Sequence, residues 1–487
     1  MNLMTRGTLT LVVALLVAGG CAIATPVSFA DPGLEAAVRE AIARPEGEIQ
    51  DHELFWVTAL DAWNRGITDL AGIEHLSSLT SLRLTTNQIT DITPLAQLPL
   101  LADLELGNNQ VSDLTPLAGL SNLRELALYS NRITDLGPLA DLVAMRALDV
   151  SSNDIAELSP LAGMRHMEVL FGGDCNIDDI SPLAGMSRLQ ALFLDGNHIP
   201  DISPLAGMRS LTNLKLRDND IHDLAPLAAL SELYSLSLSG NRIADISAVA
   251  ELTGLQILNL ERNEIRSVEP LAALQRLYGL SLDENRIEDV SALGRLETLR
   301  VLSLSGNPLG NVDELGRLRH LTGFICQHAG IQSVDFLAGL VDLEGLDLTG
   351  NQIEDIQALA NLPALRQLYL GGNLIRDIAA LAGARLERLW LDGNRISRVE
   401  VSLEILGELS GYIFDPNAQE ARDASCTTPH VNLSGNLLTD LSLLTQWTLP
   451  TGCIVSLADN PAVTSEPAPA DAALLSELEA RGVIICR

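Results

Sequence analysis

The sequence predicts an α/β solenoid, in which short parallel strands stack into one long concave sheet and tight turns line the convex side. Three observations predict this fold. An apolar pattern returns about every 22 residues, which is the period of a stacked strand-and-turn unit. Leucines alternate with other residues inside each copy, as in a strand with one buried face. Ser or Thr followed by Pro then begins a segment that is too short for a full α-helix.

One well-formed copy runs from Leu79 to Ala96 as LTSLRLTTNQITDITPLA. Later copies keep this spacing, and they begin at Leu101, Leu123, Met145, Met167, Leu189, Leu211, Leu233, Leu255, Leu277, Leu299, Leu321, Leu343 and Leu365. A single unit cannot bury its leucines alone, so neighbouring units must stack. A solenoid of this kind grows in one dimension and needs no second core.

Each position of the copy has a physical role. Leu82 and Leu84 point inward from a short strand. Asn87 ends the strand in a turn, where its buried amide must bond backbone groups of its own and the neighbouring turn. Thr93 and Pro94 cap and begin a 3-10 turn. With strands about 4.8 Å apart, about 19 repeats make a sheet of roughly 90 Å.

An acidic residue precedes the 3-10 turn in most copies. The column comprises Asp69, Asp91, Asp113, Asp135, Glu157, Asp179, Asp201, Asp223 and Asp245. Stacked carboxylates about 5 Å apart repel one another, so we predict that each one caps the turn that follows it. Cation binding along the column is the alternative, although calcium prefers several oxygens that converge on one point.

Helical caps are expected at both ends, because an uncovered solenoid end exposes leucine core. In the N-terminal cap, residues 31–56, Asp31 can cap a helix that extends to Ile42. In the C-terminal cap, residues 463–487, a helix over Asp471–Ala480 precedes a last short strand.

The repeats occupy residues 57–462 between these caps. They are regular over 79–385 and irregular over 386–462. The weak copies in the irregular part precede Asn417, Asn436 and Asn460.

Residues 1–30 resemble an export signal, with Arg6, no acidic residue and an apolar run from Leu9 to Ala18. The run is too short to span a bilayer. Two kinds of processing fit. Signal peptidase could cut after AIA at Ala24 or after SFA at Ala30. Alternatively, VAGGC resembles a bacterial lipobox whose Cys21 is acylated, which would give a lipid anchor. Both predict a secreted, periplasmic or envelope-tethered, extracytoplasmic protein.

Charge and motifs exclude several function classes. Acidic residues number 63 and basic residues 31, for a formal net charge of −32, and Lys215 is the only lysine. Nucleic acid is not expected as a partner, because phosphates need a basic footprint. We find no phosphate-binding loop, zinc-protease motif or nucleophile elbow, so we expect no enzyme activity, no cofactor and no metal site.

The repeats resemble those of bacterial leucine-rich-repeat proteins of the internalin-like type, which have 22-residue units and a short convex turn. The resemblance covers the sequence after the signal region and implies a horseshoe that recognises a partner. The chain departs from the surface adhesins of that group, because it has neither a cell-wall sorting signal nor an immunoglobulin-like domain after the repeats. Host-cell adhesion is therefore not implied.

Large side chains at sheet positions between the leucines are the candidate contact residues. They are Tyr129, Phe171, Phe193, Ile325, Tyr369 and Trp390. In a chain with 3% aromatic residues, exposed aromatics on an open face suggest a binding site. Covering the neighbouring backbone is the other explanation. We therefore predict a non-catalytic scaffold that binds a protein partner on its concave face, with a glycan-binding module as the alternative.

The cysteines divide into two groups. Cys175 occupies an asparagine position and Cys326 a core leucine position, so both should be buried. Cys426, Cys453 and Cys486 lie near the C-terminus of an exported chain, where disulfides persist. We favour a Cys426–Cys453 bond, although three cysteines allow other pairings.

Overall fold

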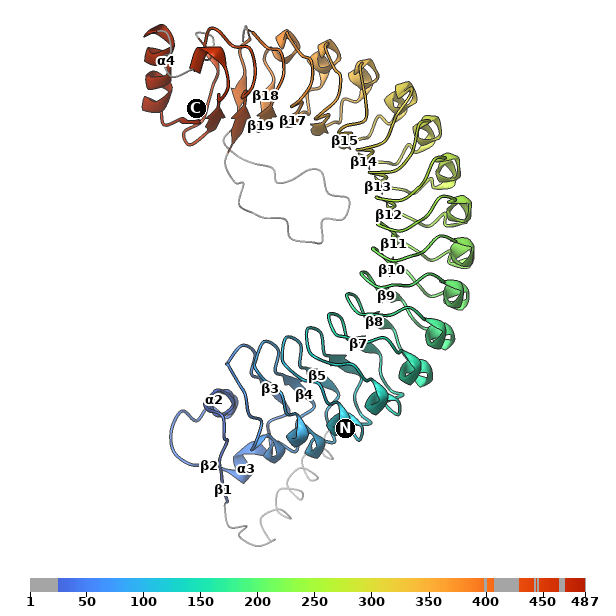
Figure 1. Cartoon of the computed structure of the whole chain (residues 1–487). Helices are drawn as coiled ribbons and strands as arrows, with labels where there is room; N and C mark the ends of the chain where they lie inside the picture. Colours follow the sequence, from blue (N-terminus) through green and yellow to red (C-terminus); the bar gives the residue numbers. More distant parts are fainter. Residues whose placement is uncertain are drawn as a thin grey trace, which may run out of the picture. The chain divides into compact units, whose positions relative to one another are not determined.

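The computed structural model describes residues 25–397, 401–406, 429–441, 444, 446–463 and 469–486. The chain divides into two compact units, unit 1 (Met1–Met167) and unit 2 (Glu168–Arg487). In each unit short parallel strands line one side and 3-10 turns line the opposite side (Figure 1). This is the predicted leucine-rich-repeat solenoid. No helix of the described residues is long and apolar enough to cross a membrane.

Unit 1 begins with a cap of mixed structure. Its elements are β1 (Pro26–Val27), which pairs antiparallel with β2 (Ile49–Gln50), α2 (Pro32–Ala41) and α3 (Asp51–Leu54). Asp31 caps α2 as predicted, because its Oδ1 accepts from the backbone N–H groups of Gly33 at 2.8 Å and Leu34 at 3.2 Å. Its Oδ2 accepts from the Thr68 N–H at 2.9 Å. One carboxylate therefore joins the cap helix to the first repeat.

The repeats of unit 1 pair in register, leucine beside leucine. The strands are β3 (Ala59–Asp61), β4 (Ser81–Arg83), β5 (Asp103–Glu105), β6 (Glu125–Ala127) and β7 (Ala147–Asp149). The turns are η1 (Ile73–His75), η2 (Thr93–Gln97), η3 (Thr115–Leu117), η4 (Gly137–Leu139) and η5 (Ser159–Gly163). Pro stands at the start of η2 to η5, where its missing N–H costs nothing.

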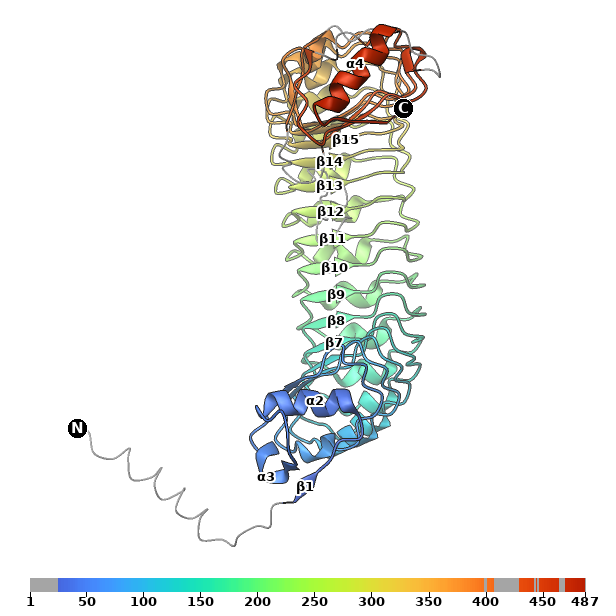
Figure 2. The ribbon, with the colours of Figure 1, turned by 90° about the vertical axis from the view of Figure 1, so that its left-hand side faces the viewer.

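Unit 2 is built from the same repeat, and Figure 2 shows its strands stacked one above another. The strands of its sheet are β8 (Val169–Phe171), β9 (Ala191–Phe193), β10 (Asn213–Lys215), β11 (Ser235–Ser237), β12 (Ile257–Asn259), β13 (Gly279–Ser281), β14 (Val301–Ser303), β15 (Gly323–Ile325), β16 (Gly345–Asp347), β17 (Gln367–Tyr369), β19 (Arg388–Trp390), β21 (His430–Asn432), β22 (Ile454–Ser456) and β23 (Ile484–Cys486). The turns opposite them are η6 (Ser181–Gly185), η7 (Ser203–Gly207), η8 (Ala225–Ala229), η9 (Ser247–Glu251), η10 (Glu269–Ala273), η11 (Ser291–Arg295), η12 (Asp313–Arg317), η13 (Asp335–Gly339), η14 (Gln357–Asn361), η15 (Ala379–Leu381) and η17 (Pro461–Val463). The predicted last helix is present as α4 (Pro469–Ala480) and the last strand as β23.

The asparagine positions form the ladder that the sequence predicts. Asn241 Oδ1 accepts from the Ile221 N–H at 3.0 Å, while its Nδ2 donates to the carbonyls of Leu216 at 2.9 Å and Leu238 at 3.0 Å. The side chain therefore satisfies buried backbone groups of its own repeat and of the preceding one. Such groups are costly to leave unpaired, and the same pattern recurs at Asn263 and Asn285.

The strand that pairs with β19 differs from the one that we predicted. β19 pairs directly with β21, with Leu389 opposite Val431. The Ile396 N–H donates to Oδ1 of Asn436, 40 residues onward, whereas this bond spans 19 to 22 residues in the other repeats, for example 20 from Ile221 to Asn241. No strand of the sheet therefore lies between β19 and β21. The weak copy predicted before Asn417 lies outside the described residues.

The inserted segment adds a strand on the flank instead. Its described part contains β20 (Glu404–Ile405), which pairs with β18 (Arg385–Leu386). Nearby, the indole Nε1 of Trp447 donates to the Val401 carbonyl at 2.8 Å. The register thus loosens in the sequence where β20 pairs with β18, outside the main sheet.

Candidate recognition surface

The open side of the sheet in unit 2 is defined by the first and third residues of each strand, which we call the strand face of unit 2. The middle residues, such as Leu170, Leu192 and Leu214, are fully buried in the core. Because neighbouring strands pair in parallel without a register shift, the third residue of each strand lies beside the third residue of the next strand. Neighbours on this face are therefore one repeat apart in the sequence.

Phe171 and Phe193 form a contact pair on this face, as their shared position predicts. Their ring centroids lie 4.7 Å apart with an interplanar angle of 31°. Phe171 is 37% exposed. On the next strand, the ammonium of Lys215 lies 5.6 Å from the centroid of the Phe193 ring. Three adjacent strands thus present two apolar rings and one cation in a row.

A second aromatic row crosses β17, β19 and β21. The Tyr369 and Trp390 centroids are 5.4 Å apart, and those of Trp390 and His430 are 5.5 Å apart. Trp390 is 37% exposed, whereas Tyr369 is only 7% exposed. Burial and the neighbouring Arg388 guanidinium lower the pKa of His430, which favours its neutral form.

The other two candidates offer less surface. Tyr129, in unit 1, lies two residues beyond the end of β6, and its ring packs on Gly107, where any Cβ would overlap it. It covers neighbouring backbone, the alternative that the sequence left open. Ile325 ends β15 and is half-buried. The placement of Tyr129 and Tyr369 therefore favours a packing role for both.

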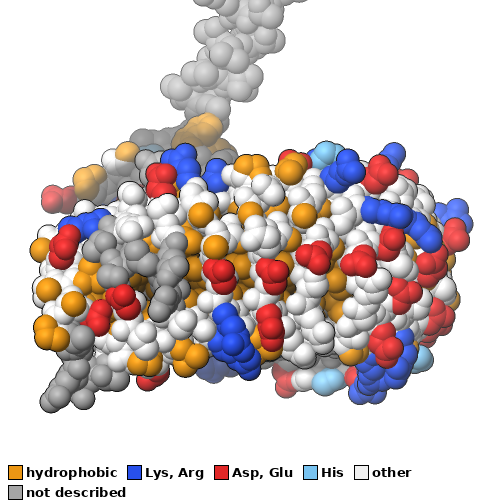
Figure 3. Space-filling view, turned by 90° about the horizontal axis from the view of Figure 1, so that it is seen from above, with side chains coloured by type: hydrophobic (Ala, Val, Ile, Leu, Met, Phe, Trp, Pro, Cys, Tyr) orange, Lys and Arg blue, Asp and Glu red, His pale blue; other side chains and the backbone are white. Residues whose placement is uncertain are grey.

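The strand faces of the two units differ in charge. Unit 1 presents several carboxylates there, namely Asp61, Asp103, Glu105, Glu125 and Asp149. In unit 2 the strand face has a single carboxylate among the described strands, Asp347, which is 9% exposed and accepts from Gln327 Nε2 at 2.6 Å. For a chain of charge −32, this leaves a long strip with few charges, which we call the neutral strip; Lys215, Asp347 and Arg388 are the charged residues on its described strands. Elsewhere the surface carries both acidic and basic side chains, as in the view of Figure 3.

Asp283, just beyond the end of β13, is an ionisable group that sequence reasoning missed. Burial raises its pKa to about 6, although the Ser303 hydroxyl and the Ser305 N–H donate to its carboxylate. Glu261 and Glu284 add smaller contributions in the same direction. Its burial depends on the neighbouring repeats, and no motif in its own repeat indicates it.

Exposed aromatics outside the strand face were also missed. Trp56 is 79% exposed, Phe55 58% and Trp63 48% in the N-terminal part of unit 1, and the Arg83 guanidinium lies 5.6 Å from the Trp63 ring. Tyr234 and Tyr278 are about half exposed on unit 2. None of these residues lies in one of the three-residue strands of the sheet. The repeat register therefore does not predict that they are exposed.

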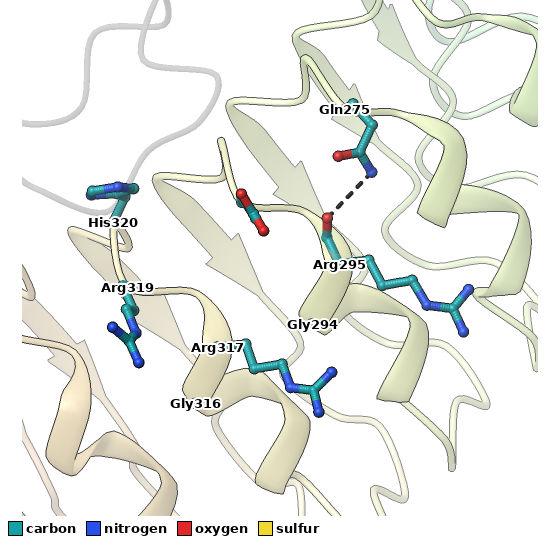
Figure 4. Close-up of a pocket in the computed structure, with 8 residues that line it drawn as sticks. Gln275, Gly294, Arg295, Gly316, Arg317, Arg319 and His320 are labelled. Atoms are coloured by element: carbon teal, nitrogen blue, oxygen red, sulfur yellow. Dashed lines mark hydrogen bonds between the residues drawn. The ribbon is translucent and has the colours of Figure 1, made fainter.

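A depression beside η11 and η12 is lined by basic side chains (Figure 4). Gln275 Nε2 donates to the Arg295 carbonyl at 3.2 Å across it. Arg295 pairs with Glu269 at 2.8 Å and Arg317 with Glu314 at 2.9 Å. His320, which also lines the depression, lies 3.1 Å from Asp342, so these three side chains already have acidic partners.

Most aspartates of the acidic column cap the 3-10 turns, as predicted. Asp91 Oδ1 accepts from the N–H of Thr93 at 2.8 Å and from its hydroxyl at 2.6 Å, and these bonds lower the pKa of Asp91. Asp201 binds Ser203 in the same way. In the described part of the chain, no group of three or more His, Cys, Asp or Glu could hold a metal ion.

The cysteines are partly outside the described residues. Cys175, Cys326 and Cys453 are buried, and Cys486 is exposed. Burial raises the pKa of Cys453 to about 12. Cys426 and Cys21 lie outside the described residues, so the disulfide and the lipid attachment stay predictions.

Comparison with known proteins agrees with the fold. The family model of leucine-rich repeats in two copies matches residues 99–141, 121–163, 209–251, 231–273 and 342–383. Further leucine-rich-repeat models match residues 253–309 and 75–92. No curated protein matches.

Three solved structures are informative. The chain is similar to an internalin (inlF) of Listeria monocytogenes at 32% identity and a TM-score of 0.64, over 71% of this chain and 98% of that one. The functional domain of another Listeria monocytogenes protein, InlJ, is 20% identical with a TM-score of 0.58, over 79% and 84% of the two chains. A leucine-rich-repeat protein of Leptospira interrogans is 23% identical with a TM-score of 0.58, over 62% and 82%. The last two likenesses concern the fold alone.

Proposed function

The chain belongs to the bacterial internalin-like leucine-rich-repeat proteins, and from this membership we propose that it is an extracytoplasmic, non-catalytic scaffold that binds a protein partner on the strand face of unit 2. The observation that supports this most is the neutral strip with its exposed aromatic rings. Protein interfaces are depleted of charge at their centre and enriched in aromatic residues. Among the described strands of unit 2 the strand face has one carboxylate, Asp347, in a chain with 63 acidic residues.

The proposed location rests on the N-terminal sequence. The apolar run from Leu9 to Ala18 after Arg6 fits an export signal. Phe29 is 6% exposed, and the Ala30 N–H donates to the Ala71 carbonyl at 3.2 Å. Residues 26–30 are thus part of the cap, which supports processing at Cys21 or after Ala24 rather than after Ala30.

The test is recovery of a partner from the envelope or extracellular fraction with the purified chain as bait. A variant with Phe171→Ser and Phe193→Ser serves as the matched control. A protein that the wild type retains and the variant does not would support the proposal. Turnover of a substrate with no such partner would contradict it.

A glycan ligand is the second candidate, because the half-exposed Trp390 ring lies beside His430 and Arg388. An aromatic face flanked by polar groups can stack on a sugar ring. A glycan array probed with wild type and Trp390→Ala tests this. A response that Trp390→Ala abolishes supports a glycan, and no response from the wild type removes it.

A further inference from the structure

We propose that Phe171, Phe193 and Lys215 form one subsite, which accepts an acidic peptide segment of the partner: an apolar side chain on the two rings and a nearby carboxylate on the ammonium. The proposal deepens the proposed function and rests on it. It names the chemistry of the partner at this position.

The first argument is geometric. The three residues are the third residues of β8, β9 and β10, which pair in register. Because parallel strands lie about 4.8 Å apart, Phe171 and Lys215 are separated by about 10 Å across the sheet. An extended peptide advances about 3.3 Å per residue. The apolar residue and the acidic residue of the partner should therefore lie about three positions apart.

The second argument concerns the partner of the cation. Ion pairs join arginines to carboxylates in many places on this chain, for example at Arg242, Arg286 and Arg295. Among the described residues no carboxylate is ion-paired with Lys215. Its ammonium lies over the Phe193 ring. In a chain of charge −32, an ammonium with no ion-paired carboxylate among the described residues is placed for an acid from outside.

The third argument is the surrounding charge. The other strand-face residues of β8 to β11 are Val169, Ala191, Asn213, Ser235 and Ser237, so none of them repels an incoming carboxylate. The next basic residue along, Arg217, already has the Asp195 carboxylate at 3.6 Å. The rest of the acidic surface is screened beyond about 8 Å at physiological salt. The apolar rings exclude water beside Lys215, which strengthens a charge-assisted bond to it.

The test uses a synthetic peptide library in which one Leu or Phe and one Asp or Glu are set at every short spacing. Each peptide has a twin with Asn or Gln in place of the acid. Wild type should prefer acid over amide by about tenfold, best at a spacing of about three residues. Tenfold corresponds to about 1.4 kcal/mol, within the range of a hydrogen bond to a charged group.

Three variants make the result decisive. Lys215→Met should lose the preference for acid and keep the preference for the apolar residue, whereas Lys215→Arg should keep both. Arg286→Met is the matched control; it removes a cation from the pair with Glu264, away from the strand face, and should change neither. A wild type that binds acid and amide twins equally, or that prefers basic peptides, overturns the inference. If its apolar preference still depends on Phe171 and Phe193, the proposed function survives that result.

The single lysine gives an independent measurement. An amine-acylating ester modifies only the Lys215 ε-amine and the α-amino terminus, because the chain has no other lysine. A selected acidic peptide should slow acylation of Lys215 several-fold while the terminus, as internal control, reacts at its usual rate. Equal acylation with and without the peptide contradicts the subsite.

Discussion

Arg262 Nη2 donates to Asp218 Oδ1 at 3.0 Å, although the two residues belong to repeats that are not adjacent. Gly240 lies between them, at the turn position where the backbone is left-handed, with φ of +67°. Any Cβ at Gly240 would overlap the Asp218 carboxylate. The glycine therefore serves the backbone and also leaves room for an ion pair that spans two repeats.

Gly240→Ala should destabilise unit 2 by about 1–2 kcal/mol, since it forces an alanine into the left-handed region and displaces Asp218. Chemical denaturation measures the change. Gly207→Ala is the control, because Gly207 is in η7 and a Cβ there meets nothing within 4 Å. Equal effects of the two substitutions would contradict this account of Gly240.

Asp283 predicts a pH-dependent stability difference. Its pKa is raised by burial to about 6 in the folded state, above its ordinary value of 3.8. The folded state therefore holds the proton more tightly, so this group's contribution to stability is full below about pH 4 and is lost as pH rises to about 6. The loss is roughly 3 kcal/mol if the whole shift applies.

Asp283→Asn removes that ionisation. The variant should be more stable than wild type at pH 7.5, by roughly 1–3 kcal/mol, and nearly equal to it at pH 4. The quantity to measure is the difference between the two proteins, because capping carboxylates such as Asp91, whose pKa is lowered, give the opposite trend in both. A difference independent of pH would show that Asp283 ionises normally.

Salt should stabilise the protein. A net charge of −32 produces self-repulsion that salt screens, while the arginine–carboxylate pairs are largely on the surface and contribute little each. We expect the melting temperature to rise as salt increases from about 0.01 M toward 1 M. A constant or falling melting temperature would indicate that the surface ion pairs outweigh the repulsion.

The mature N-terminus follows from the packing of the cap. Removal of residues 26–30 would delete β1 and expose the site of Phe29. Mass spectrometry of the exported protein should therefore find Thr25, or an acylated Cys21, as the first residue. A protein that begins at Asp31 would contradict this argument.

Much of the fold could be predicted because the core leucines and asparagines of each repeat contact mainly the adjacent repeats. The spacing from Leu79 to Leu365 therefore specifies which leucines meet, and Asn241 shows how one residue type closes every turn. Prediction failed where the pairing of strands does not follow the spacing of the repeats in the sequence. The aromatic pattern before Asn417 resembles a repeat in the sequence, but β19 pairs directly with β21, so no strand of the sheet lies between them.

The strand register of the candidate contact residues could be predicted from the repeat. The exposure of their side chains was harder to predict. Phe171 and Phe193 share a column, so their contact followed from the period. The burial of Tyr369 and the packing of Tyr129 on Gly107 depend on the size of residues one repeat away. The raised pKa of Asp283 likewise arises from burial among neighbouring repeats.

The most direct measurement of the central claim compares partner affinity and melting temperature in the Phe171→Ser, Phe193→Ser double variant. Binding should weaken by about 2 kcal/mol or more, with a stability change of about 0.5 kcal/mol or slightly above, because Phe193 is half-buried. Leu170→Ala, a fully buried neighbour, should instead cost about 2–5 kcal/mol of stability. A double variant that stays folded and binds the partner as wild type does would contradict the claim that this strand face is the recognition surface.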